Sequence, residues 1–320
     1  MPAPDAPDAP DAPDAPDVPD VPARWVITGA GGFVARHLLP LLPGAVALVR
    51  PGGARPALDL AADDLLEVDL LDADGLRAAL RGLARRGPLA GLVHLGGAAS
   101  GGAAGPAVHR VNVDGALHAA DALWAAAPGA AVLQLSTGYV YGERQAPADE
   151  DAPLEPIGDY ARSKAAAERA LVDLAQGRRL LRLRAFNHAG PGQGSGYALP
   201  DWGRALASGA TRLHTGWLGA VRDVADVREL AAGIALLTAD PSGWPPVLNL
   251  CSGQAWTMRA LLDRLVALRG GPPPHIDEGE GGRGGLRASR GSRARADRLG
   301  LPRPRPINQT LADLLRAGAR

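Results

Sequence analysis

Short apolar segments that alternate with helical ones constrain the fold of this chain more than any other feature. An initial strand at 25–28 is followed by similar strand-like segments at 46–50, 65–70, 91–97, 130–137 and 179–187. Helical patterns fall between them, notably at 76–86, 106–127 and 159–176. Near-continuous apolar strands separated by helices predict a parallel sheet covered on both faces. We therefore expect an α/β fold with a doubly wound parallel sheet, which binds ligands at the carboxyl ends of its strands.

Composition divides the chain into three parts. Residues 1–22 repeat proline and aspartate every three positions, which favours extended backbone and offers nothing to bury, so we expect a disordered tail. Residues 23–187 carry the alternating pattern and form the expected dinucleotide-binding domain. Residues 188–320 are rich in turn formers, glycine and arginine, and we expect them to form mainly a smaller substrate-binding lobe, with part of 218–250 returning to the main sheet.

The bulk composition excludes several function classes. Lys+Arg and Asp+Glu both number 34, so the zero net charge gives a nucleic-acid partner no overall electrostatic support. A single cysteine, Cys251, excludes an intrachain disulfide and a cysteine metal cluster. No apolar run approaches the roughly 20 residues that span a bilayer. We expect a cytoplasmic protein with no metal site and no nucleic-acid or membrane partner.

A glycine-rich turn directly after the first strand predicts a dinucleotide site. Gly29, Gly32 and Ala35 form a G-x-x-G-x-x-A pattern at a helix start. The first glycine permits a tight turn, the second lets backbone approach a pyrophosphate, and a small third residue allows close packing of helix on strand. We assign Gly29, Gly32, Phe33 and Val34 to cofactor binding, against the alternative of a turn with no ligand.

The end of the second strand indicates which dinucleotide binds. An acidic residue there would hydrogen-bond the ribose 2′-hydroxyl of NAD. This strand instead ends in Arg50, Arg55 follows, and the first acidic residue is Asp59. An arginine beside a 2′-phosphate favours NADP(H), with NAD(H) possible. The alternative is that Arg50 is a solvated residue at a strand end.

Lys164 is the only lysine among 34 basic residues, and Tyr160 precedes it by one helical turn. Free tyrosine has a pKa near ~10, and a nearby ammonium stabilises the phenolate and lowers that pKa. Lysine is a compact charge that fits beneath a tyrosine, whereas the planar guanidinium of arginine reaches differently. The pair therefore predicts a tyrosine that acts as a general acid, unless Lys164 is only a surface residue.

A Y-x-x-x-K pair after a glycine-rich first turn resembles the short-chain dehydrogenase/reductase family, specifically its extended epimerase/dehydratase branch. The resemblance covers residues 24 to about 315. It implies a catalytic trio of Thr137, in "STGYVYG", with Tyr160 and Lys164, and a homodimer acting on a nucleotide-sugar. It also implies that "VHLGGAAS" (93–100) contacts the cofactor through Leu95, Gly96 and Gly97, and that the third strand contacts it through Asp69 and Leu70. Asn112 resembles an asparagine of the family in the helix that follows 93–100. In "VRDVADV" (221–227), the resemblance implies that Arg222 contacts the substrate diphosphate.

The stretch "FNHAGPGQ" (186–193) is similar to that of members acting on GDP-sugars, both 4,6-dehydratases and reductases, and implies that Asn187 contacts the substrate phosphates. In dehydratases a carboxylate closely follows the catalytic Ser or Thr. Here Gly138, Tyr139 and Val140 follow Thr137, and Glu143 comes after the turn. An acid and a tryptophan of the family's C-terminal pattern are missing from "LRASRGSRARADRLGL", which leaves the sugar and the base open.

The expected function is NADPH-dependent reduction of the 4-keto group of a GDP-4-keto-6-deoxy-sugar. One alternative is an NAD-dependent sugar-nucleotide 4-epimerase, which retains its cofactor and passes hydride out and back. The other is a non-catalytic NADP-binding sensor, which would not need the tyrosine–lysine pair.

Overall fold

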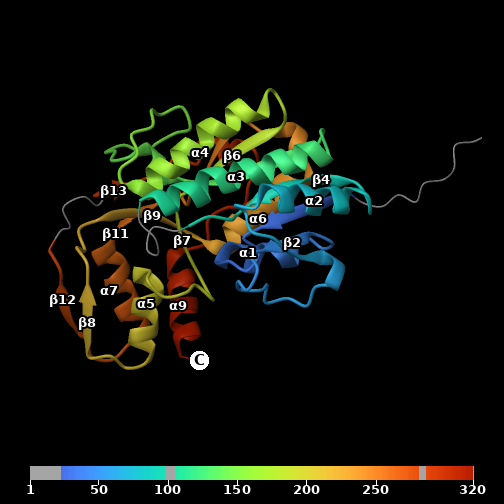
Figure 1. Ribbon diagram of the computed structural model, residues 1–320. Coiled ribbons are helices and arrows are strands. Elements are labelled where there is room, and N and C mark those ends of the chain that lie inside the picture. The colour runs from blue at the N-terminus through green and yellow to red at the C-terminus, as the bar shows by residue number, and fades with distance from the viewer. Residues whose placement is uncertain (1–22, 99–104, 281–285, 320) are drawn as a thin grey trace, which may run out of the picture.

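The computed structural model describes residues 23–98, 105–280 and 286–319 (Figure 1). The expected disordered tail at 1–22 and the last two residues of "VHLGGAAS" lie outside the described residues. No helix in the described ranges is long and apolar enough to cross a membrane.

A parallel sheet forms the centre of the molecule, as the sequence predicted, and it has seven strands. Its order is β10-β6-β5-β4-β1-β2-β3. The strand order reverses between β1 and β4, and this switch point is where ligands bind in sheets of this type. The strands are β1 (Arg24–Thr28), β2 (Val46–Val49), β3 (Leu65–Glu67), β4 (Leu89–His94), β5 (Ala131–Thr137), β6 (Leu180–Ala185) and β10 (Val247–Leu250).

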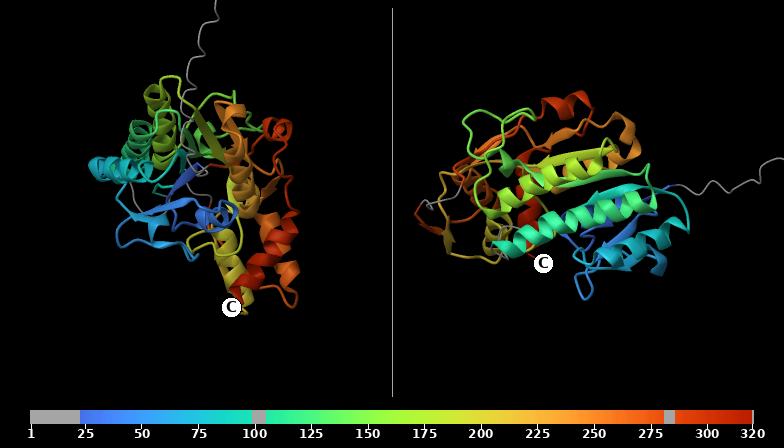
Figure 2. Two further views of the ribbon diagram at one scale, coloured as in Figure 1. Left: turned by 90° about the vertical axis from the view of Figure 1, so that its right-hand side faces the viewer. Right: turned by 45° about the horizontal axis from the view of Figure 1, so that its top comes forward.

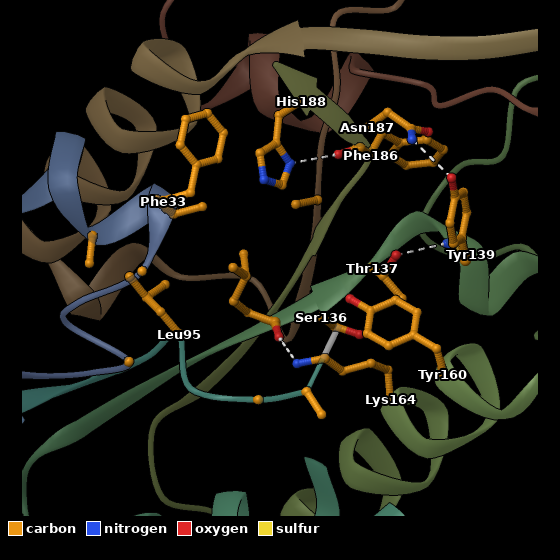
Figure 3. A pocket seen from close by; sticks show the side chains of 18 of the residues that line it. Phe33, Leu95, Ser136, Thr137, Tyr139, Tyr160, Lys164, Phe186, Asn187 and His188 are labelled. Atoms are coloured by element: carbon orange, nitrogen blue, oxygen red, sulfur yellow. Dashed lines mark hydrogen bonds between the residues drawn. The ribbon is translucent and has the colours of Figure 1, made fainter. Parts of the chain in front are cut away.

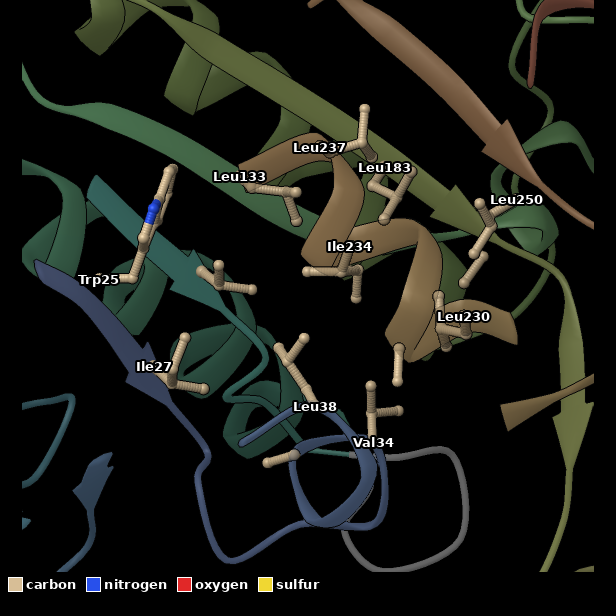
Figure 4. Close-up of a cluster of buried hydrophobic side chains, with 14 of the residues drawn as sticks. Trp25, Ile27, Val34, Leu38, Leu133, Leu183, Leu230, Ile234, Leu237 and Leu250 are labelled. Atoms are coloured by element: carbon tan, nitrogen blue, oxygen red, sulfur yellow. The ribbon is translucent and has the colours of Figure 1, made fainter. Parts of the chain in front are cut away.

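Helices cover both faces of this sheet because successive strand residues point in opposite directions. Ile27 belongs to the core beneath α1 (Phe33–Leu38) and α6 (Val227–Ala239), together with Leu38 and Ile234 (Figure 4). Val26 belongs to the core on the opposite face, which is covered by α2 (Ala73–Ala84), α3 (Pro106–Ala126) and α4 (Asp159–Ala175). Figure 2 shows α3 and α4 side by side along that face. The predicted doubly wound architecture is confirmed.

Two elements end earlier than the sequence pattern predicts. The helical pattern that starts after the first glycine-rich turn continues in the sequence through Leu42, but α1 ends at Leu38. A 3-10 turn, η1 (Leu39–Leu41), follows because Pro40 has no N–H to continue the α-helix. The strand expected at 179–187 stops at Ala185. Beyond Phe186 the chain starts β7 (Asn187–Ala189), which pairs with β9 (Val221–Asp226) in a second sheet.

A smaller group of elements lies beside the large sheet, at the lower left of Figure 1. Its four-stranded sheet contains β7, β9, β11 (Ala255–Thr257) and β13 (Ala288–Ser289), and β8 (Arg212–Thr215) pairs with β12 (His275–Glu278). Three mutually packed helices, α5 (Ala198–Ala207), α7 (Met258–Arg269) and α9 (Ile307–Gly318), bury Trp202, Leu262 and Leu311. The remaining short elements are η2 (Ala62–Asp64), η3 (Gly138–Tyr141), η4 (Pro241–Gly243) and α8 (Ala294–Arg298).

Candidate active site

A cavity of about 340 Å³ opens at the carboxyl ends of the parallel strands, between the glycine-rich turn and the start of the smaller group of elements (Figure 3). It brings together the turn after β1, the end of β5, the helix α4 and the segment after β6. The residues that line it are Gly29, Gly32, Phe33, Val34, Ala35, Leu95, Gly97, Ala98, Leu135, Ser136, Thr137, Tyr139, Tyr160, Lys164, Ala185, Phe186, Asn187, His188, Gln193, Gly194 and Tyr197.

Close backbone packing explains the glycines of the turn. Gly29 has φ +64°, and a Cβ there would lie 2.8 Å from the main-chain nitrogen of Gly96. A Cβ on Gly31 would lie only 1.8 Å from the carbonyl oxygen of Ala54, a requirement that the G-x-x-G pattern did not reveal. Gly32 is the N-cap of α1 and supplies no side-chain cap, so the first N–H groups of the helix remain available to an anion. This bare cradle fits a dinucleotide phosphate.

The segment after β4 connects the turn to Lys164. Thr28 Oγ1 hydrogen-bonds His94 Nδ1 at 2.8 Å and accepts from the Gly96 N–H at 3.2 Å, which holds this segment against β1. A Cβ on Gly97 would lie 2.7 Å from Asn112 Oδ1 and 3.3 Å from Lys164 Nζ. Any residue larger than glycine at position 97 would therefore clash with the Asn112 side chain and crowd the Lys164 ammonium.

Tyr160 and Lys164 extend from α4 toward Thr137 at the end of β5 (Figure 3). Lys164 is buried, and its Nζ donates to the carbonyl oxygen of Leu135 at 3.0 Å. Burial lowers the pKa of Lys164 to about 8, and the Glu168 carboxylate opposes this effect. The structure thus places the only lysine inside the cavity, so the alternative of a surface lysine is wrong.

The pKa of Tyr160 corrects one sequence expectation. Lys164 was expected to lower it, but burial and then the phenols of Tyr139 and Tyr197 raise the pKa of Tyr160 to about 12, while the hydrogen bond with the Thr137 hydroxyl lowers it. The helical spacing of the sequence predicted that Lys164 lies near Tyr160. It did not predict that the Tyr160 phenol is buried, nor that the Lys164 ammonium donates to the Leu135 carbonyl. Tyr160 is therefore protonated at neutral pH, the form that can donate a proton.

The segment 186–189 forms the opposite wall of the cavity. Asn187 Nδ2 donates to the Tyr139 hydroxyl at 2.9 Å. The His188 ring stacks on Phe33, with ring centroids 6.0 Å apart and an interplanar angle of 12°, and its Nδ1–H donates to the Phe186 carbonyl at 3.1 Å. The sequence motifs did not assign His188 and Tyr139 to the site, although the two residues lie within "FNHAGPGQ" and "STGYVYG" and both line the cavity.

Several residues assigned from the sequence lie away from the cavity lining. Arg50 is exposed at the end of β2. Arg222 donates to main-chain carbonyls, those of Val221 and Leu286 at 2.8 Å each. Asp69 Oδ1 accepts from the Leu71 N–H. The Leu70 side chain packs beside Gly96, with its Cδ1 atom 2.6 Å from where a Cβ on Gly96 would be, and neither residue lines the cavity.

Carboxylates are absent from the lining within the described ranges. Glu143, the nearest acid after the "VYG" turn, accepts from the Arg287 N–H instead. The same ranges hold no group of three His, Cys, Asp or Glu residues able to bind a metal ion. The cavity therefore offers phenol, hydroxyl and ammonium groups for proton transfer.

Comparison with known proteins agrees with this geometry. Residues 25–251 match the family described as the NAD dependent epimerase/dehydratase family. The GDP-6-deoxy-D-mannose reductase of Pseudomonas aeruginosa is 34% identical over 168 residues, which cover 49% of this chain and only 55% of that protein. The dTDP-6-deoxy-L-talose 4-dehydrogenase (NAD(P)(+)) of Kitasatospora kifunensis is 30% identical over 274 residues, 80% of this chain and 82% of that protein.

Among solved structures, RMD from Pseudomonas aeruginosa complexed with NADPH superimposes with a TM-score of 0.76 at 28% identity, covering 93% of this chain and 99% of that one. The family match covers most of the described sheet and every catalytic candidate. This chain belongs to the NAD dependent epimerase/dehydratase family, the extended branch of the short-chain dehydrogenases/reductases.

Proposed function

We propose that this chain is an NADPH-dependent reductase of the 4-keto group of a GDP-linked 4-keto-6-deoxy-sugar. The observation that carries the proposal is the composition of the cavity. It combines a phosphate cradle with Thr137, Tyr160 and Lys164, and the described residues add no carboxylate to it.

The residues divide the chemistry between them. The glycine-rich turn at Gly29 and Gly32 and the segment at Gly97 would hold the cofactor, which supplies a hydride to the carbonyl carbon when it is bound. Tyr160 donates its phenolic proton to the carbonyl oxygen, which therefore becomes a hydroxyl. The Thr137 hydroxyl orients that oxygen and, through its hydrogen bond to Tyr160, stabilises the phenolate that remains, while the Lys164 ammonium supplies the positive charge of the cavity.

The raised pKa of Tyr160 suits a proton donor. With a pKa of about 12, the phenol holds its proton throughout the neutral range and is ready to donate it to a carbonyl oxygen.

Absence of a carboxylate supports a reductase over a 4,6-dehydratase. Elimination of water across C5 and C6 of the sugar needs an additional acid and base. Tyr139 lies two residues after Thr137 and its hydroxyl accepts from Asn187, while Glu143 is engaged by the Arg287 N–H. Neither residue supplies a carboxylate to the cavity.

The choice of GDP rests on "FNHAGPGQ" and on the printed name of the Pseudomonas relative; the Kitasatospora relative is named for a dTDP-sugar. NADPH is supported by the cofactor named for the solved RMD structure and by Arg50 at the end of β2, because an arginine at this strand end favours a 2′-phosphate. The experiment below therefore compares GDP-linked with dTDP-linked sugars and NADPH with NADH.

The deciding experiment presents the purified protein with GDP-mannose and with the GDP- and dTDP-linked 4-keto-6-deoxy-sugars, each with NADPH or NADH, and identifies products by NMR. We expect NADPH oxidation with the GDP-linked keto sugar, a 6-deoxyhexose product, and no turnover of GDP-mannose. Tyr160→Phe is the matched inactive control. Release of a keto sugar from GDP-mannose would defeat the proposal. Tightly bound NAD with no NADPH consumption would favour the epimerase.

A further inference from the structure

A buried polar cluster of Ser136, Glu168 and Arg184 lies next to the catalytic residues. Ser136 is the residue before Thr137, Glu168 follows Lys164 by one helical turn, and Arg184 lies on the neighbouring strand β6. The side chains of Glu168 and Arg184 are 1% and 4% exposed. Because burying charges costs free energy, this placement inside the protein calls for a physical explanation.

The hydrogen bonds of this cluster join three elements. Ser136 Oγ donates to Glu168 Oε1 at 2.5 Å, which links the end of β5 to α4. Arg184 donates to the same carboxylate from Nε to Oε1 at 3.0 Å and from Nη2 to Oε2 at 2.7 Å, which links α4 to β6. Arg184 Nη1 also donates to the Tyr141 hydroxyl at 2.9 Å, so both partners of the ion pair have further hydrogen bonds.

Two adjacent links therefore hold β5 against α4 at the point where catalysis is proposed. One is the hydrogen bond from Lys164 Nζ to the Leu135 carbonyl, and the other is the bond from Ser136 to Glu168. The first bond is made by Lys164, which is itself a residue of the site. The second is made by Ser136, which directly precedes Thr137 in the chain. Together they set the position of the Thr137 hydroxyl relative to the side chains that extend from α4.

We propose that Ser136, Glu168 and Arg184 are positioning residues, which fix the distance between Thr137 and the Tyr160–Lys164 pair and keep a negative charge beside Lys164. The inference rests on the proposed reduction at Thr137, Tyr160 and Lys164. It concerns groups that touch neither the transferred proton nor the carbonyl.

The electrostatics of Lys164 agree with this role. Burial lowers its pKa, and the Glu168 carboxylate on the same helix raises it. A titratable group on another element, His94 at the end of β4, also lies near Lys164. Burial, and to a lesser degree the Lys164 charge, lower the pKa of His94 to about 3, so this ring is neutral and adds no charge. Glu168 thus favours the charged ammonium near neutral pH.

Ser136→Ala tests the link without changing any charge. We expect its turnover number for the reaction to fall about tenfold or more, because small displacements of catalytic groups are costly, with KM and the NADPH dissociation constant unchanged. Thr238→Val is the control, since it removes a buried hydroxyl that donates within α6 to the Ala235 carbonyl, away from the cavity. A wild-type turnover number in Ser136→Ala, or an equal loss in both variants, would overturn the positioning role.

The single lysine allows a second test that needs no substrate. In protein labelled with [ε-¹³C]lysine, one side-chain resonance reports the protonation of Lys164. We expect Glu168→Gln to lower its midpoint by about half a pH unit or more, and Thr238→Val to leave it unchanged. The double variant Glu168→Gln/Arg184→Met avoids an unpaired buried guanidinium and should lower the midpoint too. Midpoints equal to wild type would reject the cluster even if the proposed substrate were wrong, whereas a shift without turnover of any keto sugar would reject only the proposed function.

Discussion

Replacing Lys164 by methionine should stabilise the protein while abolishing its activity. The ammonium is buried, and its pKa falls from 10.5 to about 8. At about 1.4 kcal/mol for each pH unit, the folded state bears a cost of about 3 kcal/mol for keeping this group charged. Methionine has a similar length and no charge, so it removes that cost.

The hydrogen bond to Leu135 reduces the gain. Its loss leaves the partly buried Leu135 carbonyl without this donor, which costs about 1–2 kcal/mol. The net stabilisation at pH 7 is therefore about 1–2 kcal/mol, or about 2–3 °C in Tm for a chain of this size. Turnover should be lost because no ammonium remains beside Tyr160.

The pH dependence of stability gives the sharper measurement. Below pH 8 the lysine is charged in both folded and unfolded states, so the full cost applies. Between about pH 8 and 10.5 the folded state releases its proton before the unfolded state does, so wild-type stability rises with pH. By pH 9.5 the wild type should have gained about 2 kcal/mol relative to Lys164→Met.

Urea midpoints of wild type, Lys164→Met and Arg169→Met at pH 7 and 9.5 would provide this comparison. Arg169 is exposed on the same helix, so its variant should follow the wild type at both values. If Lys164→Met is less stable than wild type at pH 7, and the difference is the same at pH 9.5, then burial does not destabilise the ammonium. The lowered pKa of Lys164 would then be wrong.

Three further predictions address the cavity and its surroundings. Tyr160→Phe should reduce turnover by about 10²–10⁴ and leave the NADPH dissociation constant near wild type by fluorescence titration, since only the transferable proton is lost; a parallel loss of affinity would contradict this role. Arg50→Glu should raise KM for NADPH far more than KM for NADH in steady-state assays, whereas equal effects would make Arg50 a surface residue. Gly97→Ala should weaken NADPH binding severely, because the added methyl would lie 2.7 Å from Asn112 Oδ1; Gly129→Ala, with nothing within 4 Å, should bind normally.

The sequence alone determined the features that depend on local periodicity. Apolar runs and helical patterns predicted the parallel sheet, because a strand buried on both faces needs an unbroken apolar sequence. The turn at Gly29 and the pair Tyr160–Lys164 were recognisable for the same reason, since the spacing of residues within one turn or one helix face is written directly in the chain.

Tertiary structure decided how those residues behave chemically. The raised pKa of Tyr160 comes from burial and from phenols that other segments bring to it. Position 31 must be glycine because the Ala54 carbonyl lies where a side chain would begin. Glu168 on α4 forms its ion pair with Arg184 on β6. Such effects depend on the approach of segments far apart along the chain and on the exclusion of water, and neither has a local sequence pattern.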